Sequence, residues 1–302
     1  MLTTGLGQPQ ESIPRGSREI EPPTQTLSSN VAAPIAAGTP TDCPVCGDVE
    51  AEPIAVCSDF HQQTAADAFL ALRCIDCGTV YISPAAVPAD HTRSRDSRVT
   101  AELSGVGRRI VQSAVGTDPS RILVLQHDST FDPGPFGPDS LRLIVLDGTL
   151  EYSQDPSTLL AALRGVVQPG NQIVLILKNL GSPSFAIFGG RHWEGYDVPG
   201  QRALYSIEGV QRLAGRVGLE VRSTSTVSDA GCWVESCRRA LYDWQAPAWL
   251  IRRFGSSSIM SRFTFGLLEG LLRWRGSGGI LVVPLTKASD ATTFSTSPPR
   301  SE

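Results

Sequence analysis

The sequence predicts an α/β fold with a parallel sheet, preceded by a small ribbon, and two observations lead to this prediction. Short apolar runs alternate with helical patterns over residues 119–285. Ahead of them, residues 41–86 hold two closely spaced cysteine pairs. We therefore expect a ribbon over 41–86, a helical linker over 87–118 and an α/β domain over 119–285.

The elements of the α/β domain follow one another as strands and helices. Short apolar or β-branched runs are typical of strands that are covered on both faces. These runs lie at residues 121–126, 141–147, 173–177, 219–226 and 279–285. Helices are predicted over 156–167 and 206–217, because apolar residues recur there at helical spacing after the N-cap residues Asp155 and Ser206. This alternation predicts a doubly wound sheet.

The composition of the chain limits the classes of function. The 302 residues carry a net charge of −4, which gives no general attraction to nucleic acid. Residues 1–40 are polar and lack the apolar run of a signal peptide, and we expect disordered tails there and over 286–302. No stretch approaches the roughly 20 apolar residues of a transmembrane helix. These features favour a cytoplasmic protein, where CxxC pairs bind metal or act as redox dithiols.

The two cysteine pairs share one form, CPVCG from Cys43 to Gly47 and CIDCG from Cys74 to Gly78. A CxxC turn points both thiolates at one site, and the glycine that follows permits the tight turn. Four thiolates make a closed tetrahedral site, which is typical of structural zinc and leaves no position for a catalytic water. We predict a zinc ion that is bound by Cys43, Cys46, Cys74 and Cys77. The alternative is two unrelated pairs that are redox-active or free.

Other candidate ligands fit this pattern less well. Cys57 could replace a ligand but has no partner at CxxC spacing, and His61 is expected on the surface. Cys232 and Cys237 are interpreted as buried thiols.

A resemblance to a known family covers roughly residues 41–285 with one large gap. The ribbon runs into Tyr81 and Pro84, and three further segments follow in order, at 143–156 (LIVLDGTLEYSQDP), 163–174 (LRGVVQPGNQIV) and 193–221. In this combination the chain resembles class I S-adenosylmethionine-dependent methyltransferases that carry an N-terminal zinc module, the sugar C-methyltransferases and their relatives. The resemblance implies a Rossmann-like sheet and methyl transfer to a sugar-type or other small acceptor. It makes the runs at 121–126, 141–147 and 173–177 the family's first, fourth and fifth strands.

The cofactor side departs from the family's pattern. The family's first strand runs into a DxGxGxG loop, whose glycines let the backbone approach S-adenosylmethionine. Here the loop contains Gln126, His127 and Asp128 and no glycine, with Asp147 nearby. Only residues 131–140 then separate the first strand from the fourth, too few for two helices and two strands, so the carboxylate that binds the ribose has no counterpart. The resemblance implies S-adenosylmethionine as cofactor, whereas these departures indicate a degenerate site.

The catalytic residues implied by the resemblance are also incomplete. Tyr152 and Gln201 stand where the family usually has histidines, while Glu151 is retained. Glu151, with His127 or Asp128 as a substitute base, is the remaining candidate for acid–base chemistry. Two hypotheses stay open: a methyltransferase with an altered cofactor site, impaired or inactive, and a non-catalytic, zinc-stabilised interaction module.

Two features of the sequence indicate partners. Loss of two strands would leave the first strand at a sheet edge, which residues 87–118, a second subunit or a protein partner would cover. Residues 238–275 interleave aromatic side chains with arginines, a pattern that can lie at a membrane surface. Helices that cap the sheet and face a partner are the commoner outcome of such a pattern.

Overall fold

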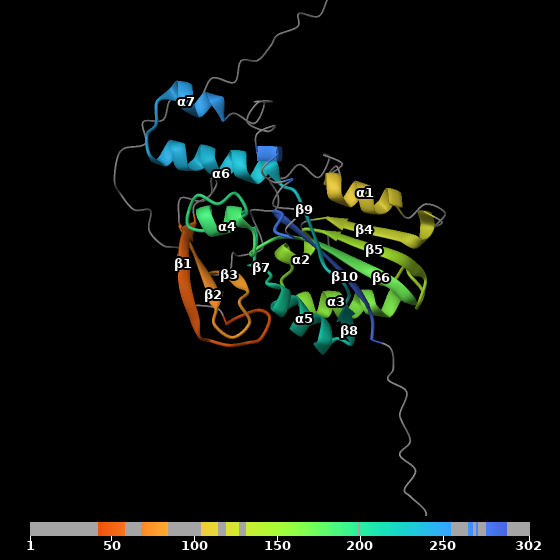
Figure 1. The fold of residues 1–302 in the computed structure, drawn as a ribbon. Coiled ribbons are helices and arrows are strands. Elements are labelled where there is room, and N and C mark those ends of the chain that lie inside the picture. Colours follow the sequence, from red (N-terminus) through yellow and green to blue (C-terminus); the bar gives the residue numbers. More distant parts are fainter. Residues whose placement is uncertain are drawn as a thin grey trace, which may run out of the picture. The chain divides into compact units, whose positions relative to one another are not determined.

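The structure is a computed structural model that describes residues 42–57, 68–83, 104–113, 119–126, 131–198, 200–254, 265–267, 270 and 276–288. The predicted tail over 1–40 and the histidines His61 and His127 lie outside these residues. The described strands form two sheets, ordered β1-β2-β3-β7 and β4-β5-β6-β10-β8, with β9 added to β10 (Figure 1).

The first sheet is built mainly by the cysteine ribbon. Strands β1 (Ala51–Cys57), β2 (Phe69–Cys74) and β3 (Val80–Ser83) form an antiparallel meander. The fourth strand, β7 (Ala203–Leu204), comes from the α/β region and pairs with Val80 and Tyr81 of β3. The ribbon sheet is therefore completed by residues more than a hundred positions downstream.

The second sheet confirms the α/β class. Strands β4 (Ile122–Gln126), β5 (Leu141–Asp147) and β6 (Val167–Lys178) are parallel neighbours. The remaining strands are β8 (Leu219–Val221), β9 (Ser225–Val227) and β10 (Ile280–Lys287). Strand β10 runs antiparallel to β6, β8 and β9, so the expectation of a parallel sheet is wrong for this strand. An apolar run predicts burial on both faces but not direction, which explains the difference.

Helices cover both faces of this sheet. Leu143 and Val145 of β5 pack in one cluster with Val106 of α1 (Gly105–Ser113). Ile144 and Leu146 point to the other face, where they pack with α3 (Pro156–Val166) and α5 (Ile207–Arg216). The caps predicted for these two helices are present: Asp155 accepts a hydrogen bond from the Thr158 amide and Ser206 from the Gly209 amide.

Some predicted boundaries differ from the structure. The strand predicted over 173–177 begins earlier, at Val167, and residues 168–171 form a bulge in β6, because Leu141 pairs with Val167 whereas Leu143 pairs with Gln172. Gly170 takes a φ of 78° there, which glycine adopts without strain. The strand predicted over 219–226 is divided into β8 and β9, and β10 continues past residue 285 to Lys287.

Strand β4 ends the sheet in the described part of the chain, as the gap in the resemblance predicts. It pairs with β5 alone, and residues 131–140 contain turns without a helix or strand. Helix α1, from the segment expected to cover the edge, packs on the face of β4 and β5. Residues 87–103 and 114–118 of that segment lie outside the described residues, so the cover of the edge stays a prediction.

The remaining helices are short, apart from α6. They are the short 3-10 helix η2 (Pro119–Arg121), α2 (Thr149–Tyr152), α4 (Pro183–Phe188), α6 (Ala230–Asp243) and α7 (Ala248–Arg253). Among the described helices, none has the length and apolar character to cross a membrane.

Candidate metal centre and neighbouring polar site

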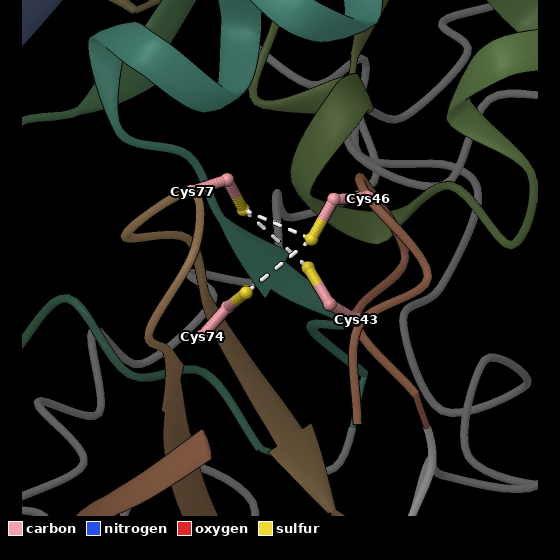
Figure 2. Close-up of side chains that lie close together, drawn as sticks. All are labelled: Cys43, Cys46, Cys74 and Cys77. Atoms are coloured by element: carbon pink, nitrogen blue, oxygen red, sulfur yellow. Dashed lines mark hydrogen bonds between the residues drawn. The ribbon is translucent and has the colours of Figure 1, made fainter. Parts of the chain in front are cut away.

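The two CxxC segments form matching tight turns. The Gly47 amide donates to the Cys43 carbonyl at 2.9 Å, and the Gly78 amide donates to the Cys74 carbonyl at 3.0 Å. Both glycines have positive φ, 76° and 68°, which favours glycine at these positions. As a result, all four thiols point at one location between the turns (Figure 2).

The spacing of the sulfur atoms suits a tetrahedral metal ion. The Sγ atoms of Cys43 and Cys77 are 3.5 Å apart, those of Cys46 and Cys74 3.3 Å, and those of Cys46 and Cys77 3.7 Å. A tetrahedron with zinc–sulfur bonds of about 2.3 Å has edges of roughly 3.8 Å, so the thiols need to move apart by only a few tenths of an ångström. These four residues could hold zinc as a closed, structural site.

The thiols share protons with one another when no cation lies between them. The hydrogen bond between Cys43 and Cys77 raises the pKa of Cys43 and lowers the pKa of Cys77 to about 5. Burial raises the pKa of Cys46 to about 11. Metal binding requires all four thiolates and therefore releases these protons.

The other cysteines lie outside this group. Cys57 is buried at the opposite end of β1 from the turns, since Ala51 pairs with Cys74 whereas Cys57 pairs with Phe69. The structure thus does not bring Cys57 to the metal centre. Cys232 is buried, as predicted, and Cys237 is partly buried.

Residues of the α5 segment donate hydrogen bonds to main-chain carbonyls of both cysteine turns. The Ser206 hydroxyl donates to the Cys77 carbonyl at 2.6 Å and accepts from the Gly209 amide at 2.8 Å. The Arg216 guanidinium donates to the Val45 carbonyl and, at 3.5 Å, to that of Cys46. Three main-chain carbonyls of the turns are therefore paired with the α5 segment. The thiols of Cys43, Cys74 and Cys77 also pack in the same core cluster as α3 and α5.

Glu151 lies beside the metal ribbon at the carboxyl end of β5. Its side chain is 4% exposed, and its Oε1 accepts a hydrogen bond from the Lys178 amide at 2.8 Å. Burial raises the pKa of Glu151 to about 7, against the opposing effects of Lys178 and of a hydrogen bond with Gln201.

Gln201 also donates to the Gly195 carbonyl at 3.1 Å. Tyr152 donates to the Asp197 carboxylate. Tyr152 and Gln201, which stand where the resemblance implies histidines, thus form hydrogen bonds with Asp197 and Gly195.

The structure contains a polar cluster that the sequence did not predict. The Lys178 ammonium lies between the carboxylates of Glu194, at 2.9 Å, and Asp229, at 3.1 Å. The ligand atoms of these two residues and of Cys232 lie within 4.8 Å of one another. Burial lowers the pKa of Lys178, but the two carboxylates outweigh it and hold this pKa well above its usual value. Lys178 could have indicated this cluster from the sequence, because it ends the apolar run of β6. The carboxyl ends of parallel strands form the binding edge of such sheets.

The predicted cofactor residues lie at the same edge. Asp147 ends β5 and is 7% exposed, and its Oδ2 accepts the Ser104 amide at 2.8 Å, just before α1. Gln126 ends β4, while His127 and Asp128 lie outside the described residues. The sequence from Ile122 to Thr130 holds no glycine, and no described strand beyond β4 supplies a carboxylate for a ribose. The residues present do not fit S-adenosylmethionine in the way that the resemblance implies.

Comparisons with known proteins give likeness at the level of solved structures alone. No family model matches the chain, and no curated protein matches it in sequence. An S-adenosylmethionine-dependent methyltransferase of Thermotoga maritima is 13% identical with a TM-score of 0.32, over 51% of this chain and 59% of that one. A phosphoethanolamine N-methyltransferase of Haemonchus contortus is 14% identical with a TM-score of 0.27, over 51% and 35%. A chain from a Haloferax volcanii complex that contains the Trm112 methyltransferase activator is 16% identical with a TM-score of 0.33, over 62% and 70%.

The chain thus spans less than two thirds of the length of the first two of these structures.

Proposed function

We propose that this chain is a zinc-stabilised interaction module on a reduced methyltransferase-like scaffold, and that it does not use S-adenosylmethionine. Zinc, held by Cys43, Cys46, Cys74 and Cys77, supplies structural cross-linking in this proposal. The methyltransferase-like scaffold in this proposal is supported by the resemblance of residues 41–285 to methyltransferases with a zinc module.

One observation carries the proposal: in the described residues the parallel sheet ends at β4. The segments identified as first, fourth and fifth strands lie side by side as β4, β5 and β6. Residues 131–140 link the first two without a further strand or helix. The chain between β4 and β5 is therefore too short to include the strand that would carry the ribose-binding carboxylate. The Asp147 carboxylate already accepts a hydrogen bond from the Ser104 amide.

Methyl transfer at an altered site is the second candidate, and Glu151 favours it. A buried carboxyl group with a pKa of about 7 is suited to accept and return a proton near neutral pH. However, its Oε1 is bound to the Lys178 amide, and Tyr152 and Gln201 hold the surrounding loop. These contacts favour a structural role for Glu151.

Calorimetric titration separates the two candidates. The full chain, with one zinc per molecule and a folded circular dichroism spectrum, is titrated with S-adenosylmethionine and with S-adenosylhomocysteine. We expect no binding heat up to millimolar ligand. Micromolar binding of either compound would overturn the proposal and support the methyltransferase. Titration of Glu151→Gln would then show whether this carboxyl group contributes to the site.

A further inference from the structure

Helix α7 has a strongly exposed tryptophan, and its other large apolar side chains are only partly buried in the described structure. Its six residues include Trp249, Leu250 and Ile251, yet none of the six is buried. Trp249 is 69% exposed. An isolated helix of this length is unstable in water, so a helix with this composition gains stability from a surface that covers it.

The end of the preceding helix adds two more aromatic rings to this surface. Tyr242 and Trp244, at the C-terminal end of α6, are 53% and 69% exposed. Helix α7 follows α6 directly and contacts it (Figure 1). We call the side chains of Tyr242, Trp244, Trp249, Arg252 and Arg253 the α6–α7 corner. Most exposed large aromatic residues of the described chain thus gather in a stretch of eight positions.

Electrostatics give this corner a positive character. The neighbouring acids are paired: Asp243 with Arg191 at 2.8 Å and with His192 at 3.0 Å, and Glu235 with Arg238. Arg252 and Arg253 are exposed one turn beyond Trp249, and helical spacing places them on the same side of α7 as its ring. Residues 244–254 contain two arginines and no acidic residue, in a chain whose net charge is −4.

We propose that the α6–α7 corner docks on an anionic lipid surface. Tryptophan and tyrosine rings have an apolar body and a polar edge, and they favour the headgroup region of a bilayer. Arginines beside them pair with lipid phosphates and with the negative surface potential of anionic membranes. Exposed rings with adjacent positive charge complement such a surface on both counts, and this inference stands whether or not S-adenosylmethionine binds.

Vesicle sedimentation of the zinc-loaded full chain tests the inference. Vesicles of phosphatidylcholine alone are compared with vesicles that also contain phosphatidylserine, and tryptophan fluorescence is recorded on binding. We expect at least roughly tenfold tighter binding to the anionic vesicles, weakened by added salt. Trp249→Ala should weaken this binding by about tenfold and Arg252→Glu by about fivefold or more.

Arg142→Glu provides the matched control, because this exposed arginine lies on β5, outside the corner, and its reversal should leave binding unchanged. Absence of binding by folded protein, or equal binding to both vesicle types, would overturn the proposal. A dimer in solution that Trp249→Ala dissociates would also overturn it and would assign the corner to a second copy of the chain. Equal loss in Arg142→Glu and Arg252→Glu would indicate general charge attraction instead of docking at this corner.

Discussion

Two compact polar groups in the described part of the chain differ in where their counter-charge comes from. At the cysteine turns, four thiols face one another and need a cation from outside the chain to be stable as thiolates. At the carboxyl end of β6, Glu194 and Asp229 face the Lys178 ammonium, so the chain provides its own cation. The first group could take a cation from outside, whereas the second already contains one ammonium between its two carboxylates.

This difference also explains which group the sequence reveals. The two cysteines of each pair have a fixed spacing in the sequence, because the turn must direct both thiolates at one point. This spacing is recognisable as the CxxCG motif. An internal ion pair needs only that its members meet in space. Lys178, Glu194 and Asp229 come from three separate segments and have no fixed spacing. Three changes test how much each buried polar group contributes.

Removal of one metal ligand should have the largest effect. We expect Cys46→Ser to abolish zinc binding and to remove folding free energy on the order of 10 kcal/mol from the ribbon and its contacts with α5. Zinc content and thermal unfolding measure this. Cys237→Ser is the matched control, because Cys237 is likewise partly buried but lies outside the group. Full zinc content in Cys46→Ser would show that this thiol is not a ligand.

Removal of the internal cation should have a smaller but large effect. Lys178→Met leaves the Glu194 and Asp229 carboxylates without their partner, and we expect a loss of about 3 to 5 kcal/mol in the free energy of unfolding. Chemical denaturation measures this loss, while zinc content should stay at one per chain.

The matched control removes all three charges, in Lys178→Met with Glu194→Gln and Asp229→Asn, and should recover much of that stability. Equal stability of Lys178→Met and the unaltered chain would mean that the pair contributes nothing.

The smallest of the three effects concerns the protonation of Glu151. Burial raises its pKa from 4.5 to about 7 in the folded protein, so the folded state binds more protons than the unfolded state between these pH values. Stability should therefore fall as the pH rises from 4.5 through 7, by about 3 kcal/mol in all. Urea denaturation across this range should show the slope in the unaltered chain and a flatter profile in Glu151→Gln. The same slope in both proteins would contradict the assignment.

The fold was predictable from the sequence where local pattern determines it. The apolar runs of β4, β5 and β6 identify buried strands, and Asp155 and Ser206 mark where helices begin. The thiol group follows from CxxCG spacing. The pairing of β3 with Ala203–Leu204 and the reversed direction of β10 were not predictable, because they depend on contacts between distant segments. The roles of Lys178 and Arg216 were missed for the same reason.

The support of the cysteine turns by α5 has a consequence for how the protein is made. Arg216 and the Val45 carbonyl that it binds are 171 positions apart, and Ser206 is 129 positions from Cys77. A nascent chain that has left the ribosome as far as β3 already presents all four thiols, but the carbonyls behind them are still hydrated. The contacts behind the cysteine turns can form only when translation has passed Arg216, so the earliest segment of the described structure depends on residues from the last third of the chain.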